Sequence, residues 1–222
     1  PLLGAVGGDL VVLDGAEQLL VPELATVGGS VRVEGVGGLS TFEVSELETV
    51  GGDVLVTDIP SLVELPFERL EVVPGDLRIS GGGLLEAVDL SRLATVGGDL
   101  RIEDLAMQVL RGEGYALISV GGDLVLADLD QWAGFYGFAW LETVGGDLRI
   151  ERAPLVDFLR GFTLLTDVGG TLSVTGNARL AYLDGFDNLD QVHGDLVLEG
   201  NPVLYGEDAF AQLRRVDGEL RI

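Results

Sequence analysis

The chain has 222 residues, and 47% of them are apolar, which is enough to build a continuous core. It has 37 acidic residues against 13 basic ones, all arginine, so its formal net charge is −24. This charge disfavours nucleic acid and anionic lipid as partners. The absence of cysteine excludes disulfides and thiolate chemistry. No apolar run is long enough for a transmembrane helix, so we expect no membrane insertion.

One short motif recurs from end to end. Each copy has a leucine three residues before an anchor valine and then a glycine-rich turn, as in Leu93–Ile102. The spacing rises from about 21 to about 24 residues, which lies within the range of solenoid repeats. A copy of this length cannot enclose a core alone, whereas stacked copies can. We therefore predict an all-β solenoid of about ten coils forming a single domain over residues 1–222, as a section of a longer protein. The anchors are Val6, Val27, Val50, Val73, Val96, Val120, Val144, Val168, Val192 and Val216.

The residues after each turn alternate between apolar and variable positions, as at Leu100 and Ile102, which is the period of a half-buried strand. Glu34, Glu103 and Glu151 form one outward row. We interpret this face as solvated with weak ion pairs, and a mixed binding face is the alternative. The neighbouring outward row contains Arg32, Arg78, Arg101, Arg149 and Arg221, with Val11, Leu55, Val125 and Val197.

The turn itself can be typed from its variants. The second residue after each anchor is always glycine, whereas the first can be Pro74, His193 or Asp217. Proline fixes φ near −65°, and an unvarying glycine suggests positive φ, so we predict type II turns. The turn-forming glycines include Gly52, Gly75, Gly98, Gly122, Gly146 and Gly170.

An acidic row follows these glycines. Ser30 and Thr171 replace the aspartate in two copies, and all three residue types have a side-chain oxygen that can accept a backbone N–H. We therefore predict a capping role. A calcium ladder is the alternative, but each copy offers one carboxylate where calcium takes six to eight oxygens. The prediction is no cofactor and no metal site. The row includes Asp53, Asp76, Asp99, Asp123 and Asp147.

An aromatic run interrupts the copy that starts at Val120. Tyr136 and Trp140 fall out of step with the apolar rows and should point outward. Arg160 and Leu164 occupy matching positions one coil later. This group is a candidate patch for a protein or glycan ligand, and local packing is an equally weighted interpretation. The aromatic residues in step with the core are Trp132, Phe135 and Phe138.

Two further departures have structural interpretations. Asn177 and Asn201 stand where the coil bends, and asparagine can bond a turn backbone. His193 is the one histidine, and it replaces a turn glycine, so we expect an exposed turn residue. No serine is placed near it by the pattern, and no acidic cluster breaks the repeat. We therefore assign no catalytic residues and predict that the chain is not an enzyme, with a carbohydrate-active β-helix enzyme as the least favoured alternative.

The pattern L-x-x-V-G-G-D-L-x-I, followed by N-x-x-L-x-x-L-x-x-F-x-x-L in Asn177–Leu189, resembles the receptor L-domain-like repeats. These relatives of leucine-rich repeats occur in ligand-binding receptor ectodomains and in bacterial surface proteins. The resemblance covers the chain at the level of the repeat and is closest over Val168–Leu198. It implies a right-handed, single-chain parallel β-helix outside the cell or at a bacterial surface, and it supplies no catalytic residues.

The expected function is a non-catalytic structural or adhesive module. Pro1–Val12 starts within the pattern and Leu213–Ile222 stops on a strand. Exposed strand edges can pair with another copy, so end-to-end assembly into a filament or surface layer is one expectation. The alternative is a ligand-binding ectodomain that uses the aromatic patch. The expected partners are therefore protein, including a second copy, or glycan.

Overall fold

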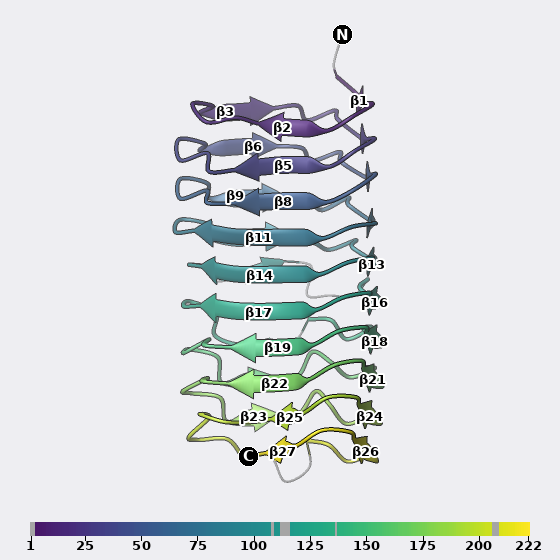
Figure 1. Ribbon diagram of the computed structural model, residues 1–222. Helices are drawn as coiled ribbons and strands as arrows, with labels where there is room; N and C mark the ends of the chain where they lie inside the picture. The colour runs from purple at the N-terminus through teal and green to yellow at the C-terminus, as the bar shows by residue number, and fades with distance from the viewer. Residues whose placement is uncertain (1–2, 108, 112–115, 136, 206–208) are drawn as a thin grey trace.

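The computed structural model describes residues 3–107, 109–111, 116–135, 137–205 and 209–222. Over these residues the chain forms strands and turns without a helix, coiled around one long axis (Figure 1). Followed from the N-terminus, it runs leftward along the front and rightward along the back while it descends, so the coil is right-handed (Figure 1). The predicted all-β parallel solenoid is confirmed. Two sheets contain ten strands each, which corresponds to about nine full turns.

The first side of the coil is a stack of two-residue strands that end on the anchor valines. All pair in parallel, with Val73 opposite Val96 and Val96 opposite Val120, which confirms the repeat spacing. The strands are β1 (Ala5–Val6), β4 (Thr26–Val27), β7 (Thr49–Val50), β10 (Val72–Val73), β13 (Thr95–Val96), β16 (Ser119–Val120), β18 (Thr143–Val144), β21 (Asp167–Val168), β24 (Gln191–Val192) and β26 (Arg215–Val216).

The second side follows the glycine turn and faces the viewer in Figure 1. Its parallel register places Leu77 opposite Leu100 and Arg78 opposite Arg101, so each inward and outward row runs straight along the axis. The strands are β2 (Leu10–Val12), β5 (Val31–Glu34), β8 (Val54–Thr57), β11 (Leu77–Gly82), β14 (Leu100–Leu105), β17 (Leu124–Leu129), β19 (Leu148–Glu151), β22 (Leu172–Thr175), β25 (Leu196–Val197) and β27 (Leu220–Arg221).

The third side is less regular and closes the coil at the back. Its strands form three short parallel sheets instead of one continuous stack. They are β3 (Gln18–Leu20) with β6 (Thr41–Glu43), then β9 (Glu64–Pro66), β12 (Ala87–Asp89) and β15 (Val109–Arg111), and then β20 (Phe158–Leu159) with β23 (Tyr182–Leu183).

The core lies inside the coil and is built from the predicted inward rows. Val96, Leu100 and Ile102 are almost completely buried, as are their equivalents in the neighbouring coils. Each buried valine or leucine contributes roughly 1.5–3 kcal/mol, so the rows bind successive coils together. Aromatic rings continue the packing: Phe162 and Phe186 stack with their centroids 5.0 Å apart.

The glycine turn differs from the prediction. A type II turn needs positive φ at its third residue, but Gly98 and its equivalents lie outside the left-handed region. The left-handed positions recur once per coil at the other end of the front strand instead. They are Gly35, Asp58, Gly81, Asp104, Asp128, Arg152, Gly176 and Gly200.

Close stacking explains the unvarying glycine. A Cβ on Gly98 would collide with Oδ1 of Asp76 on the preceding coil, and a Cβ on Gly122 would collide with Oδ1 of Asp99. Glycine is therefore retained for the space it leaves to the neighbouring coil. The same collisions occur between Gly52 and Ser30, Gly75 and Asp53, Gly146 and Asp123, and Gly170 and Asp147.

Candidate functional surfaces

A ladder of side-chain oxygens runs along the edge of the front sheet. Oδ1 of Asp76 accepts the backbone N–H of Asp99 at 2.9 Å, and Oδ1 of Asp99 accepts that of Asp123 at 2.8 Å. The predicted acceptor role is confirmed, and its partner lies on the next coil. Because Ser30 and Thr171 use their hydroxyl oxygens in the same way, the row tolerates them. The side-chain ladder continues from Asp9 to Glu219 through nine such bonds.

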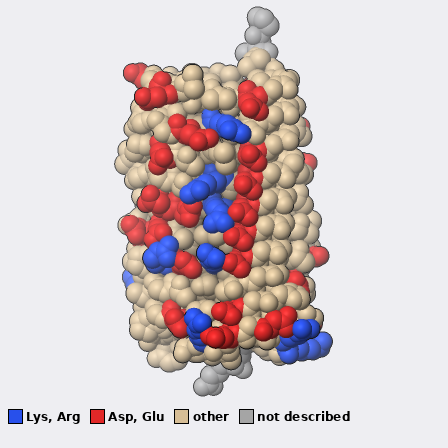
Figure 2. All heavy atoms as spheres, viewed as in Figure 1, with Lys and Arg blue, Asp and Glu red and all other residues tan. Residues whose placement is uncertain are grey.

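Arginines line the front face beside this ladder. Figure 2 shows them in a central band with acidic side chains on both sides. Arg101 donates to Oδ2 of Asp99 at 2.9 Å and to Oδ2 of Asp123 at 2.7 Å. Burial acts to raise the pKa of Asp99, but the N–H of Asp123 and the Arg101 guanidinium outweigh it, so the pKa lies below its usual value. The ion pairs expected on this face are present, and they help to hold the Asp99 carboxylate in its charged form.

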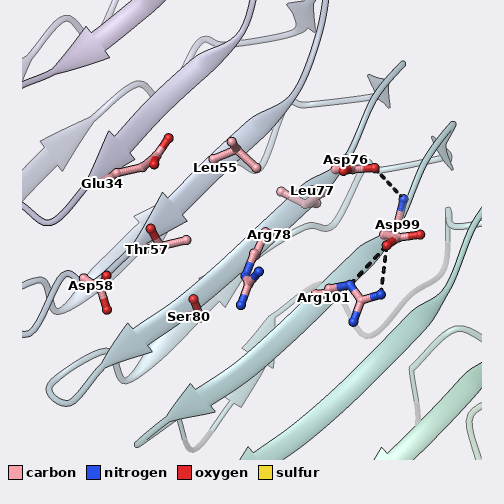
Figure 3. Close-up of a pocket in the computed structure, with 10 residues that line it drawn as sticks. All are labelled: Glu34, Leu55, Thr57, Asp58, Asp76, Leu77, Arg78, Ser80, Asp99 and Arg101. Carbon is pink, nitrogen blue, oxygen red and sulfur yellow. Dashed lines mark hydrogen bonds and ion pairs between the residues drawn. The ribbon is translucent and has the colours of Figure 1, made fainter.

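The front face is hollowed where its outward residues are short. A shallow groove of about 490 Å³ lies over β8 and β11, with Leu55, Thr57 and Ser80 along it (Figure 3). The guanidiniums of Arg78 and Arg101 border it, and both are already ion-paired, Arg78 with Glu103 at 2.8 Å. The groove can hydrogen-bond a polar molecule, but its two guanidiniums are already paired within the protein.

Two apolar side chains of the predicted aromatic patch are exposed, and its role in binding stays a prediction. Trp140 is 54% exposed and Leu164 is 39% exposed. The Thr163 hydroxyl donates to the Ala139 carbonyl at 3.1 Å, so these two exposed side chains belong to neighbouring coils. Arg160 is exposed but is bonded to Asp184. Tyr136 lies outside the described residues. The prediction that three aromatic residues lie in the core is confirmed. Each is only 2% exposed: Trp132, Phe135 and Phe138.

A second aromatic feature was not predicted from the sequence. Phe158 pairs in register with Tyr182, and Tyr182 forms a parallel bridge with Tyr205. Tyr182 is 51% exposed and Tyr205 is 76% exposed. We call these three side chains the aromatic strip. The signal in the sequence that could have revealed it is an aromatic residue that recurs at the coil spacing. In two of the coils this residue lies two positions before a charged outward residue, Arg160 or Asp184.

The asparagines and the histidine behave as expected. Asn177 is fully buried, accepts the N–H of Ala153 at 3.0 Å and donates to the carbonyl of Ile150 at 3.0 Å. His193 is exposed on the turn, with Asp167 at 3.2 Å from Nε2 and Asp217 at 3.3 Å from Nδ1. Asn177 therefore holds the bend of the coil, and the His193 ring lies between two carboxylates.

Within the described ranges, no three His, Cys, Asp or Glu side chains gather closely enough to hold a metal ion. The same part of the chain contains no helix that is long and apolar enough to cross a membrane.

Comparison with known proteins adds no relative to this picture. No protein-family model, curated protein or solved structure matches the chain.

Proposed function

We propose that the chain is a non-catalytic structural and adhesive module that works outside the cell, at a bacterial surface. The observation that supports this most is the side-chain ladder, which joins every coil to the next beside a continuous core. Such stacking makes a rod whose sides are available for contact, and further coils can extend it along its axis. The repeat also supports a relationship to the receptor L-domain-like repeats, which we propose on sequence pattern alone.

End-to-end association is the proposed structural role. The outermost strands β2 and β27 each pair with one neighbour in this chain. A strand edge presents backbone N–H and C=O groups that a second copy can pair with. In β2, Leu10 donates its N–H to the Ser30 carbonyl on the next coil, and alternation along a strand turns the N–H of Val11 away from β5.

Electron microscopy and light scattering over a concentration series test this role. Fibres or end-to-end oligomers are expected. Val11→Pro should reduce association, because proline removes the outward N–H without removing an internal ladder bond. Its melting temperature should match that of the wild type. A chain that stays monomeric at all concentrations refutes the proposal, and so does association that Val11→Pro leaves unchanged while the fold is intact.

The second candidate function is ligand binding through Trp140 and Leu164. It is favoured by the exposure of both side chains on neighbouring coils. Since Trp132 is buried, ligand-induced quenching of tryptophan fluorescence would report mainly on Trp140. Trp140→Ala should weaken binding of protein or glycan ligands, with Leu84→Ala as the exposed apolar control. Unchanged binding by Trp140→Ala would eliminate this site.

A further inference from the structure

The aromatic strip forms a continuous band on the back of the solenoid, half-buried at Phe158 and exposed at Tyr182 and Tyr205. Phe158, Tyr182 and Tyr205 stand on three successive coils in one register. Strands in a sheet are about 4.8 Å apart, so the band extends roughly 10 Å along the axis. Exposed aromatic side chains in a contiguous row are typical of contact surfaces.

The first ring of the strip already holds a cation. The guanidinium of Arg160 lies over the Phe158 ring, 5.5 Å from its centroid. The same side chain donates from Nε to Oδ2 of Asp184 at 2.9 Å. The Phe158 ring is fixed in turn against Gly134, where a Cβ would collide with it. A ring on one coil and a carboxylate on the next therefore hold one guanidinium.

The following coils repeat the rings but not the cation. At the position equivalent to Arg160, the next coil has Asp184, two residues after Tyr182. Among the described residues, no arginine lies over the rings of Tyr182 and Tyr205. The side chain of Asp184 is 49% exposed, and its hydrogen bond to Arg160 uses Oδ2. The strip thus offers two tyrosine rings with no described arginine over them, and on the same coil as Tyr182 it offers the Asp184 carboxylate, which Arg160 engages through one oxygen.

We propose that Tyr182, Tyr205 and Asp184 bind arginine or lysine side chains of a basic segment in a partner protein. A cation over a tyrosine face is attracted by the ring quadrupole, and the adjacent carboxylate adds a charge-assisted hydrogen bond. The net charge of −24 attracts basic segments and repels acidic ones. Each exposed ring contributes only about two- to fivefold in affinity, so a partner needs several cationic residues. This site does not depend on end-to-end association.

Ring-labelled tyrosine tests the site directly, since the chain has four tyrosines. The probe is the blocked peptide Arg-Gly-Arg-Gly-Arg, and its citrulline counterpart has the same shape without charge. The arginine peptide should shift the NMR signals of Tyr182 and Tyr205, and the citrulline peptide should leave them in place. Calorimetry should show about two- to fivefold weaker binding for Tyr182→Leu.

Matched variants separate the strip from the general acidity of the surface. Leu84→Ala removes an exposed apolar side chain outside the strip and should leave the affinity unchanged. Asp184→Asn should weaken binding more than Asp14→Asn, which removes an exposed carboxylate elsewhere. Raising the salt concentration should weaken every variant while the ratio of wild type to Tyr182→Leu persists.

Three results would overturn the proposal. The first is binding of the citrulline peptide as tight as that of the arginine peptide. The second is a control variant that weakens binding as much as its matched strip variant, Tyr182→Leu or Asp184→Asn. The third is a neutral oligosaccharide such as cellohexaose shifting the same two tyrosine signals more tightly than the arginine peptide, which would make the strip a glycan surface.

Discussion

Replacing Gly98 by alanine tests whether coil stacking selects the glycine of the turn. The new Cβ would collide with Oδ1 of Asp76, the oxygen that accepts the N–H of Asp99 at 2.9 Å. The carboxylate must move away, so Gly98→Ala should break the same hydrogen bond that Asp76→Ala removes. The two substitutions should therefore be strongly coupled.

The two substitutions are expected to be coupled because both break the same hydrogen bond, from the Asp99 N–H to Asp76. A solvent-accessible hydrogen bond contributes about 1 kcal/mol, so Asp76→Ala should cost about that much free energy of unfolding. Gly98→Ala should cost the same amount plus strain against the Gly75 carbonyl carbon, which the Cβ approaches to 3.1 Å. The double variant loses the bond once, so it should be about 1 kcal/mol more stable than the sum of the single effects predicts. Effects of alanine on the unfolded chain cancel in this cycle.

Denaturant unfolding followed by circular dichroism gives the four free energies, and a coupling of this size corresponds to about 2–4 °C in melting temperature. Amide exchange at Asp99 should accelerate in each of the three variants. The control pairs Asp76→Ala with Gly170→Ala, whose Cβ would collide with Asp147 several coils away. That pair should be additive. Additivity within about 0.5 kcal/mol for the neighbouring pair would refute the stacking explanation.

Four further outcomes are expected. Asn177→Ala should cost about 2–4 kcal/mol in denaturant unfolding, because it strands a buried N–H and a buried carbonyl, and the half-buried Asn201→Ala should cost less. The folded-state pKa of Asp99 is lowered, so its carboxylate stabilises the fold above about pH 4; the advantage in melting temperature over Asp99→Asn should shrink as the pH falls below that value. Arg152 has φ of 53°, in the left-handed region, so Arg152→Gly should be about 0.5–1 kcal/mol more stable than Arg152→Ala. The reason is that glycine relieves the left-handed strain by more than it costs in entropy of the unfolded chain. Equal stabilities of the two variants would contradict this. Calcium chelation should leave the melting temperature unchanged, and a fall would indicate bound calcium.

The coil and its core could be predicted because they depend on order within one copy of the repeat. Leucine and valine three residues apart, followed by alternation at Leu100 and Ile102, define inward positions wherever the copy lies. Recurrence at about 24 residues then requires stacking, since one copy has too little core of its own. The acceptor role of the aspartates was also accessible, because Ser30 and Thr171 share that chemistry.

The partners across coils could not be read in the same way. An unvarying glycine is equally consistent with positive φ and with close approach, and only the position of Asp76 beside Gly98 distinguishes them. The left-handed corner is occupied by glycine, aspartate and arginine in different coils, so no single residue type marks it in the sequence. Tyr182 and Tyr205 likewise become one surface only when their coils lie in register.

The sequence by itself determined the solenoid, its repeat length and its buried rows, because hydrophobic periodicity is a property of each copy. The tertiary structure alone decided why the turn needs glycine, which N–H each aspartate accepts and where exposed aromatic rings form a strip. These features depend on atoms that are more than twenty residues apart in the chain, as Asp76 and Asp99 are, and that meet only after the coils stack at a spacing of about 4.8 Å.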